Sequence, residues 1–245
     1  MEDNIMKIAL QLYSVRDCIN NGEDMLRVLG EVKKIGYDGV EFAGYQGLSA
    51  EVLRARLDEV GLKCVGCHIG TDNFTADKID ETIKFHKILG TDLIGTGGAP
   101  HDTPEGLAET CRIFKEGNEY AEKKGVKLYY HNHTGEFKKL ENGVVPMDEL
   151  KKAAWLEVDT YWSYYAGEEN AVLLPALKDR IVHIHLKDGN DGTPCALGEG
   201  TNDIKKVVDT AKAIGCEWLV VENDDPVPDG LSDVKRSIEY LKTVL

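Results

Sequence analysis

The 245-residue sequence predicts an α/β fold, a single-domain (β/α)₈ TIM barrel over residues 1–245. Short β-rich apolar runs alternate with amphipathic helical stretches from one end of the chain to the other, and there are eight such pairs. This alternation is typical of parallel strands joined by right-handed crossovers, and eight units close naturally into a barrel. The chain length is also that of one such barrel.

Each strand is indicated by an apolar run rich in β-branched or aromatic residues. We expect strands at residues 7–13, 39–43, 63–68, 92–96, 127–132, 155–159, 181–186 and 218–222. The stretches between them have the apolar spacing of helices. We expect helices at about residues 23–35, 49–60, 75–89, 104–124, 147–153, 169–178, 202–214 and 231–243.

Glycines mark the ends of several expected helices, where a left-handed closing residue is favoured. They are Gly36, Gly61, Gly90, Gly125 and Gly215. The alternative is an open doubly wound sheet, but the G-x-G-x-x-G fingerprint of that fold is missing after the first strand, where the sequence reads QLYSVRD. The barrel is therefore the preferred interpretation.

Composition excludes several classes of function. A formal charge of −14 opposes binding to a nucleic-acid backbone, and no apolar run approaches the length of a membrane span. The opening residues Met1–Lys7 lack the features of a secretory signal, so we expect a cytoplasmic protein. Cys64 and Cys67 form a C-x-x-C without a second pair at ligand spacing, and we interpret them as buried, reduced thiols rather than a zinc site.

Polar residues recur at the carboxyl ends of the expected strands, where a buried strand should be apolar. They are Gln11, Glu41, His68, His131, His133, Asp159, His183, His185 and Glu222. In a barrel these positions converge on the mouth that carries the active site. Side chains alternate along a strand, so His183, His185 and Lys187 share one face, as do Glu157 and Asp159.

Four of these residues, from the last four strands, predict a divalent-metal site. His131, Asp159, His185 and Glu222 supply two imidazoles and two carboxylates, a donor set that suits manganese, zinc, iron or cobalt better than calcium. The alternative is structural: a strand-end histidine is often a hydrogen-bonded core residue, and Asp159 and Glu222 could be cap or turn carboxylates. We interpret His183 as structural, with Glu157 as its hydrogen-bond partner.

Other residues are candidates for contact with a small polar substrate. We expect Gln11, Glu41, His68, Trp162 and Glu199 to contribute to substrate binding. Trp162 lies in the aromatic run DTYWSYYAG, which either packs in the core or stacks on a sugar face. The loop PCALGEGTND offers backbone amides that could receive a phosphate or hydroxyl, or it is an ordinary turn before a helix. Arg16 and Lys187 are the candidate charges for an anionic group.

Over nearly its whole length the sequence resembles the sugar phosphate isomerase/epimerase family of xylose isomerase-like barrels, related to inosose dehydratases and more distantly to endonuclease IV. The matching stretches, in order, are QLYSVRD, GYDGVEF, YYHNHTGEF, EVDTYW, HIHLKD with LGEG, and VVEND. The resemblance implies a metal held by Glu, Asp, His and Glu from strands five to eight, which corresponds to Asp159, His185 and Glu222. His131 stands where the family has its first glutamate, and it either ligates the metal, acts as a base, or leaves that place to water or Glu136.

The resemblance further implies a metal-dependent isomerase or epimerase of a small sugar, ketose or sugar phosphate. Manganese is the expected ion, with zinc, cobalt, iron or magnesium as alternatives, and Glu222, His131, His133 and Lys187 are the expected catalytic groups. An inosose dehydratase-like lyase is the runner-up, followed by a non-catalytic sugar-binding subunit. Endonuclease activity is disfavoured by the acidic charge. The expected partner is a sugar or polyol, and a homo-oligomer is compatible with the sequence.

Overall fold

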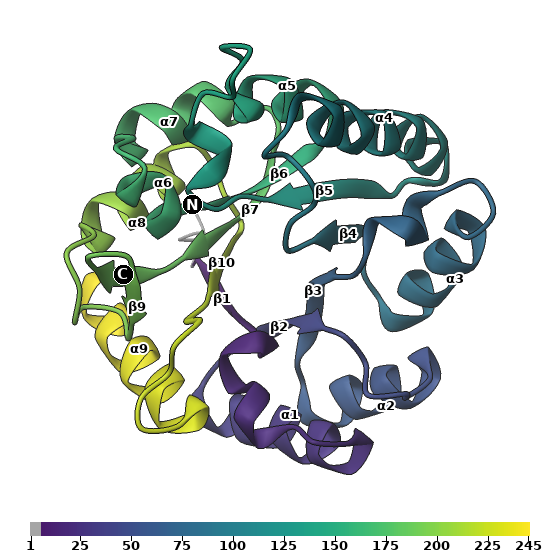
Figure 1. Cartoon of the computed structure of the whole chain (residues 1–245). Helices are drawn as coiled ribbons and strands as arrows, with labels where there is room; N and C mark the ends of the chain where they lie inside the picture. The colour runs from purple at the N-terminus through teal and green to yellow at the C-terminus, as the bar shows by residue number, and fades with distance from the viewer. Residues whose placement is uncertain (1–5) are drawn as a thin grey trace.

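A computed structural model describes residues 6–245 and shows, within them, eight parallel strands closed into a barrel inside a ring of helices (Figure 1). Each strand pairs with its neighbours along the chain, and the last strand pairs with the first. The strands are β1 (Lys7–Gln11), β2 (Gly39–Ala43), β3 (Lys63–His68), β4 (Leu93–Thr96), β5 (Lys127–His131), β6 (Trp155–Asp159), β7 (Ile181–Leu186) and β10 (Trp218–Val221). The predicted (β/α)₈ barrel is confirmed.

Helices follow the strands and cover the outside of the barrel. They are α1 (Gly22–Ile35), α2 (Ala50–Val60), α3 (Ile79–Leu89), α4 (Pro104–Ala121), α5 (Pro146–Ala153), α6 (Thr160–Tyr165), α7 (Asn170–Leu177), α8 (Ile204–Ala213) and α9 (Gly230–Val244). Short 3₁₀ turns are η1 (Leu12–Cys18), η2 (Thr71–Phe74), η3 (Glu122–Lys124) and η4 (Gly135–Phe137). The five predicted helix-closing glycines all have positive φ angles, as left-handed caps require.

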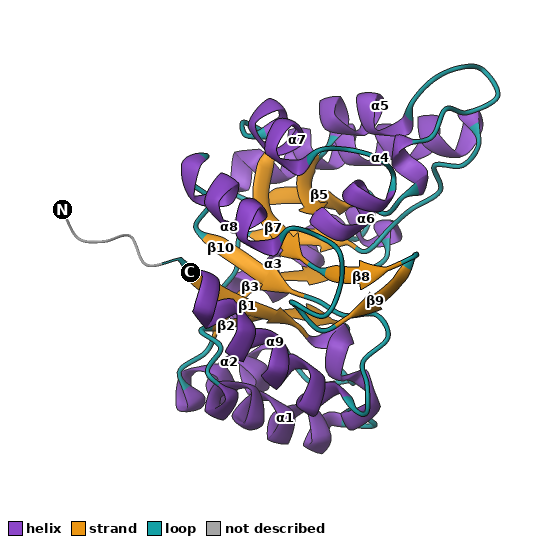
Figure 2. Ribbon diagram, turned by 90° about the vertical axis from the view of Figure 1, so that its left-hand side faces the viewer, coloured by secondary structure: helices purple, strands orange, loops and turns teal. Residues whose placement is uncertain are grey.

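The structure differs from the sequence-based expectation in a few places. The first strand ends at Gln11 rather than residue 13, because the Gln11 side chain accepts a hydrogen bond from the Tyr13 amide and so begins η1. The helix expected at 75–89 begins only at Ile79. Two elements were not predicted: the short helix α6 and the antiparallel hairpin β8 (Asp188–Asn190) and β9 (Thr193–Cys195), which Figure 2 shows on the side of the barrel away from the C-terminus.

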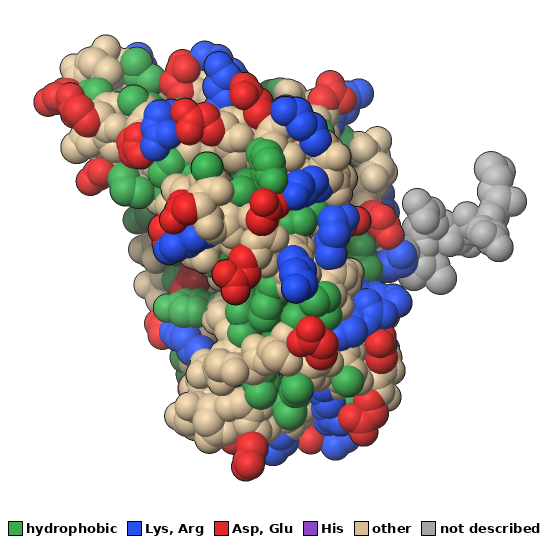
Figure 3. All heavy atoms as spheres, turned by 90° about the vertical axis from the view of Figure 1, so that its right-hand side faces the viewer, with side chains coloured by type: hydrophobic (Ala, Val, Ile, Leu, Met, Phe, Trp, Pro, Cys, Tyr) green, Lys and Arg blue, Asp and Glu red, His purple; other side chains and the backbone are tan. Residues whose placement is uncertain are grey.

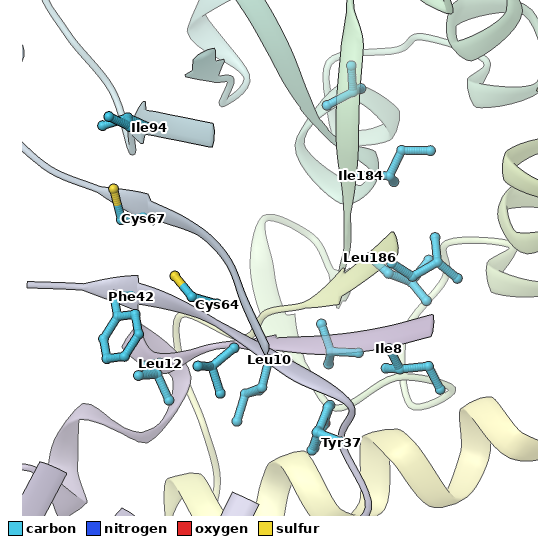
Figure 4. Close-up of a cluster of buried hydrophobic side chains, with 14 of the residues drawn as sticks. Ile8, Leu10, Leu12, Tyr37, Phe42, Cys64, Cys67, Ile94, Ile184 and Leu186 are labelled. Atoms are coloured by element: carbon cyan, nitrogen blue, oxygen red, sulfur yellow. The ribbon is translucent and has the colours of Figure 1, made fainter. Parts of the chain in front are cut away.

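The hydrophobic core lies between the strands and the helices. Outward-facing strand residues such as Ile8, Leu10, Phe42 and Ile184 are fully or almost fully buried there (Figure 4). Cys64 and Cys67 belong to the same core as free thiols, as the sequence predicts. This shell accounts for most of the buried apolar surface, so the barrel interior is left free to hold polar side chains.

Inside the barrel the side chains form layers. Ala9, Val65 and Val220 make a small apolar cluster of their own, apart from the outer core. Further along the strands the interior becomes polar. The register pairs Glu157 with His183 and Asp159 with His185, so acidic and imidazole side chains of adjacent strands lie side by side.

The outer surface carries charges of both signs. Figure 3 shows one face of the molecule, on which acidic and basic side chains are mixed with hydrophobic ones. Exposed pairs within helices, such as Arg112 with Glu116 in α4, are part of this pattern. Of the helices in residues 6–245, none combines the length and apolar character that crossing a bilayer requires. The opening segment 1–7, interpreted above as lacking a secretory signal, lies mostly outside the described residues.

His86 is a buried histidine of α3 that ties the helix to the barrel. Its Nδ1 lies 2.6 Å from the Thr82 carbonyl, and its Nε2 lies 2.7 Å from the Tyr45 hydroxyl and 2.9 Å from Cys67 Sγ. Burial lowers the pKa of His86 to about 4, with the Thr82 carbonyl opposing the shift. The folded protein therefore favours the neutral ring.

We predict that His86 makes the fold sensitive to mild acid. A lowered folded-state pKa gives stability that is complete above the unfolded pKa of about 6.5 and is lost as the pH falls toward the folded pKa. Between roughly pH 7.5 and pH 5, the wild type should lose about 2 kcal/mol more unfolding free energy than His86→Leu. Urea denaturation in the presence of a chelator measures this, and equal losses in the two proteins would contradict it.

Candidate active site

A pocket of about 560 Å³ opens at the carboxyl ends of the strands, where a barrel carries its active site. Its walls come from loops after β1 to β6 and β10, from α6 and from the β8–β9 hairpin. The lining residues are Tyr13, Ala43, His68, Gly97, His131, His133, Trp162, Pro194, Glu222 and Asp224. Five of them, His68, His131, His133, Trp162 and Glu222, are among the residues singled out in the sequence.

The four predicted metal ligands meet at this pocket, where His131 and Glu222 are part of the lining. We call His131, Asp159, His185 and Glu222 the outer cluster; one donor atom from each lies within 4.8 Å of the other three, and all four residues are buried. His131 Nε2 is 3.3 Å from Asp159 Oδ2 and 3.7 Å from Glu222 Oε2. His185 Nδ1 is 2.9 Å from Glu222 Oε2.

These separations suit a divalent ion. Metal–donor bonds of about 2.1 Å in a tetrahedral site put the donors about 3.4 Å apart, close to the observed spacing. His131 Nδ1 is buried without a hydrogen-bond partner, whereas Nε2 faces the carboxylates. The outer cluster could therefore hold a metal with His131 as a nitrogen donor in place of the family's glutamate.

Lys187 places a fixed positive charge behind the outer cluster. Its Nζ lies 2.9 Å from Asp159 Oδ2, 2.7 Å from Glu222 Oε2 and 2.7 Å from Asp224 Oδ2. Burial lowers the pKa of Lys187, but the three carboxylates outweigh it and hold the pKa well above its ordinary value. Burial raises the pKa of the Asp159 and Glu222 carboxyl groups, but the nearby Lys187 ammonium group lowers it by more. The pKa of Asp159 falls to about 2, and that of Glu222 lies well below its usual range. Both carboxylates are ionised at neutral pH.

A second polar group lies one layer deeper. We call Glu41, His68, Glu157 and His185 the inner cluster; their donor atoms also lie within 4.8 Å of one another. His185 Nε2 is 2.6 Å from Glu41 Oε2 and 3.0 Å from Glu157 Oε1, and His68 Nε2 is 2.7 Å from Glu157 Oε2. The two clusters share the ring of His185, whose nitrogens face opposite groups.

His183 and Glu157, expected to be hydrogen-bond partners, do lie side by side, with His183 Nδ1 2.5 Å from Glu157 Oε1, but neither atom has a hydrogen-bond partner. Glu41 in β2 and Glu157 in β6 approach each other across the barrel, which was not predicted. The sequence indicates which residues lie near strand ends, but not which residues of opposite strands meet inside the barrel. The only signal for it was that both are acidic residues in otherwise apolar strands.

Tyr129 is a further residue of the site that the sequence reasoning did not assign. Its hydroxyl donates a hydrogen bond to Glu41 and accepts one from the Cys67 amide at 2.9 Å. The ring crosses the interior because β3 and β4 have glycines opposite it: a Cβ at Gly95 would lie 2.1 Å from the ring, and one at Gly66 would lie 2.4 Å from its hydroxyl. The two glycines thus make room for the tyrosine that holds Glu41.

His133 and Trp162 form one wall of the pocket. Their rings lie 6.1 Å apart, and His133 lies 4.9 Å from the ring of His131. Burial, reinforced by His131, lowers the pKa of His133 to about 4, so its imidazole is neutral at pH 7. Trp162 Nε1 is buried without a hydrogen-bond partner, and its N–H is available to a ligand hydroxyl.

Several predicted contacts lie away from the pocket lining. Gln11 and Glu41 are fully buried beneath it, where the Gln11 amide donates to Glu41 Oε2 at 2.7 Å. Glu199 is partly exposed and pairs with Arg236 at 2.8 Å. Arg16 donates to the Tyr13 and Asp224 carbonyl oxygens. Gln11 and Glu41 therefore stabilise the site from beneath and do not line the pocket.

The loop after β7 does not present free amides, contrary to one expectation above. The Asp188 carboxylate accepts hydrogen bonds from the amides of Gly198, Gly200 and Asn202 at 2.9–3.0 Å, as well as from Gly189. The Asp188 carboxylate therefore occupies these amides, which agrees with the alternative of a structural turn before a helix rather than a site for an external phosphate or hydroxyl.

We predict that Lys187→Met strongly destabilises the metal-free protein. The substitution leaves Asp159, Glu222 and Asp224 without their shared counter-charge, and breaking a buried pair in this way costs about 3–5 kcal/mol. A divalent ion should restore part of the loss. Urea denaturation with and without Mn²⁺ tests this against Lys205→Met, which removes an exposed pair with Asp209 and should cost less than about 1 kcal/mol. A Lys187→Met loss as small as that of the control would contradict the prediction.

Comparison with known proteins agrees with the barrel fold. The chain is 24% identical to an inosose dehydratase of Histophilus somni and 27% identical to one of Clostridium beijerinckii, each over 88% of this chain and 88% of the relative. Among solved structures, a sugar phosphate isomerase/epimerase from Parabacteroides distasonis superposes with a TM-score of 0.82 at 23% identity, covering 97% of this chain and 98% of that one. An L-ribulose 3-epimerase superposes with a TM-score of 0.76 at 16% identity, covering 98% and 95%. The model of the xylose isomerase-like TIM barrel family matches residues 29–244, and the chain therefore belongs to that family.

Proposed function

We propose that the protein is a divalent-metal-dependent isomerase or epimerase that moves a proton beside the carbonyl group of an unphosphorylated keto-sugar or keto-polyol. The observation that carries the proposal is the outer cluster, four buried metal-type donors at a pocket of about 560 Å³. His131, Asp159, His185 and Glu222 would hold a divalent ion, which would supply Lewis-acid polarisation of the carbonyl worth several kcal/mol in the transition state.

Glu222 is our candidate for the base. It lines the pocket and is ionised, and its Oε2 is already engaged by His185 and Lys187. Oε1 is therefore the oxygen that receives the carbon-bound proton. Lys187 stabilises the carboxylate when the proton leaves it again, because its ammonium group stays in contact with the same side chain.

Imidazoles from another strand also line the pocket. His131 ends β5 and His133 follows it, so they approach a bound substrate from a different strand than Glu222 does. A second group is what epimerisation needs, because the proton returns to the other face of the same carbon. His133 lines the pocket and lies outside the outer cluster, so its imidazole is our candidate for the second acid or base.

The charges of the pocket support an unphosphorylated substrate. In residues 6–245, no Lys or Arg is among the pocket-lining residues, whereas Glu222 and Asp224 both are. The Lys187 ammonium group is wholly buried and held by three carboxylates. A phosphate dianion would find no Lys or Arg side chain in the pocket lining, whereas hydroxyl groups can use the free Trp162 N–H and the aromatic face of Trp162.

Elimination of water is the second candidate function. It is favoured by the curated relatives, which are named inosose dehydratases, and by His131, which removes one of the two carboxylates of the resemblance. A dehydratase uses the same first step, loss of the proton beside the carbonyl, and then expels a hydroxyl from the next carbon. The two candidates therefore differ in product and share one site.

We predict that the protein, loaded with Mn²⁺ and incubated with unphosphorylated ketoses or keto-inositols in deuterated water, places deuterium on the carbon beside the carbonyl. Mass spectrometry and NMR of the recovered sugar measure the exchange. A labelled isomer supports the epimerase, whereas a product lighter by one water supports the dehydratase. Unlabelled, unchanged substrate across both series would contradict the proposal.

We predict that Glu222→Gln lowers the exchange rate by at least about 100-fold, because the amide cannot accept the carbon proton. The matched control is Glu217→Gln, which alters an exposed residue just before β10 that pairs with Lys7. Normal deuterium exchange in Glu222→Gln would rule out Glu222 as the base. The fold of both variants is checked by their urea denaturation curves.

A further inference from the structure

The inner cluster holds two carboxyl groups without a fixed counter-charge. Glu41 and Glu157 are fully buried, and the side chains of opposite charge type within 4 Å of them in residues 6–245 are the histidines 68, 183 and 185. Lys187 contacts the outer carboxylates instead. Buried carboxylates need protons, hydrogen bonds or a cation to offset the loss of water.

Hydrogen bonds satisfy only part of this group: Glu41 accepts from Gln11 and Tyr129, and Glu157 Oε2 lies 2.7 Å from His68 Nε2, which leaves Glu157 Oε1. Glu157 Oε1 lies 2.5 Å from His183 Nδ1 and 3.0 Å from His185 Nε2, yet it accepts no hydrogen bond from either ring. Both ring nitrogens of His183 are buried without a partner as well. Glu157 Oε1 and the ring nitrogens of His183 are therefore polar atoms without a hydrogen-bond partner at the inner cluster.

The spacing in the inner cluster is close to that of a metal shell. The contacts between its imidazole nitrogens and carboxylate oxygens run from 2.6 Å (His185 to Glu41) to 3.4 Å (His68 to Glu41). Donors bound at about 2.1 Å are about 3.0–3.4 Å apart in octahedral or tetrahedral geometry, so loading requires only a small expansion. Two carboxylates and two imidazoles are again a set for manganese, zinc or cobalt.

The ring of His185 joins the two clusters. Its Nδ1 faces Glu222 in the outer cluster, and its Nε2 faces Glu41 and Glu157 in the inner one. The other inner ligands do not belong to the outer cluster, so the outer set remains complete when the inner one is filled. His68 lines the pocket and is only partly buried, which gives an ion a path from the mouth to the inner cluster.

We propose that Glu41, His68, Glu157 and His185 form a second divalent-cation site, and that His185 bridges the two ions through its two ring nitrogens. The inference rests on the proposed function, because the outer ion is one end of the bridge. Bridging uses both nitrogen lone pairs of His185, so its ring protons leave to solvent on loading. The positive charge that the histidines would otherwise carry is then supplied by the inner ion.

The test is the number of ions bound, which does not depend on turnover. Chelator-treated protein is equilibrated with Mn²⁺, dialysed, and assayed for metal per chain by mass spectrometry of the elements. We expect two ions in the wild type, one in Glu157→Gln and one in Asp159→Asn, since these variants each damage one cluster. Glu41→Gln serves as a second inner variant if Glu157→Gln does not fold.

The matched control is Glu136→Gln, which changes a fully buried carboxylate outside both clusters, bonded to the Tyr130 hydroxyl and the His133 amide. It should retain two ions. In electron paramagnetic resonance, doubly loaded wild type should show the broadened signal of two coupled Mn²⁺ ions, and Glu157→Gln the signal of an isolated ion.

The outcomes separate the two proposals. One ion in the wild type, lost in Asp159→Asn and kept in Glu157→Gln, overturns the second site and leaves the outer centre intact. No ion in the wild type overturns both. Two ions in the wild type that persist in both Glu157→Gln and Glu41→Gln also overturn the assignment of the inner site, because the second ion would then lie elsewhere.

Discussion

The structure depends on how negative charge is balanced inside the barrel. Glu41, Glu157, Asp159 and Glu222 all lie within the strand cylinder and are almost completely removed from solvent. Lys187 offsets only the outer two. Buried carboxylates need hydrogen bonds, protons or a cation to face them, so the contacts that His68, His131, His183 and His185 make with these groups are part of what the fold depends on.

The geometry of the barrel determines where these carboxylates and imidazoles lie relative to one another. Alternation along β6 puts Glu157 and Asp159 on one face at successive depths, and β7 does the same for His183 and His185. Register then sets each carboxylate against an imidazole of the next strand. Glycines at 66 and 95 leave space for the Tyr129 ring, which fixes Glu41 from the opposite wall. The polar layers of the interior lie next to the pocket, and the apolar layer of Ala9, Val65 and Val220 lies nearer the other end of the strands.

Much of this arrangement could be predicted from the sequence, for physical reasons. The periodicity of apolar residues and the helix-closing glycines located the eight units of the barrel, and polar residues at strand ends identified the outer cluster. Contacts across the barrel could not be predicted in the same way, because Glu41 and Glu157 are far apart in the chain and their meeting depends on the shear of the closed sheet. Likewise, α6 escaped prediction because Asp159, interpreted as a ligand, also caps that helix by accepting the Tyr161 and Trp162 amides.

The turn after β7 has a wider meaning for specificity. The Asp188 carboxylate accepts hydrogen bonds from the backbone amides of this turn. Pro194, which lines the pocket, lies in the segment between Asp188 and those amides, so these hydrogen bonds fix the conformation of that segment without a ligand. A sequence related to this one could acquire recognition of a charged ligand at that turn only by first giving up Asp188. One side chain, Asp188, thus determines whether the amides of this turn are free to bind anything else.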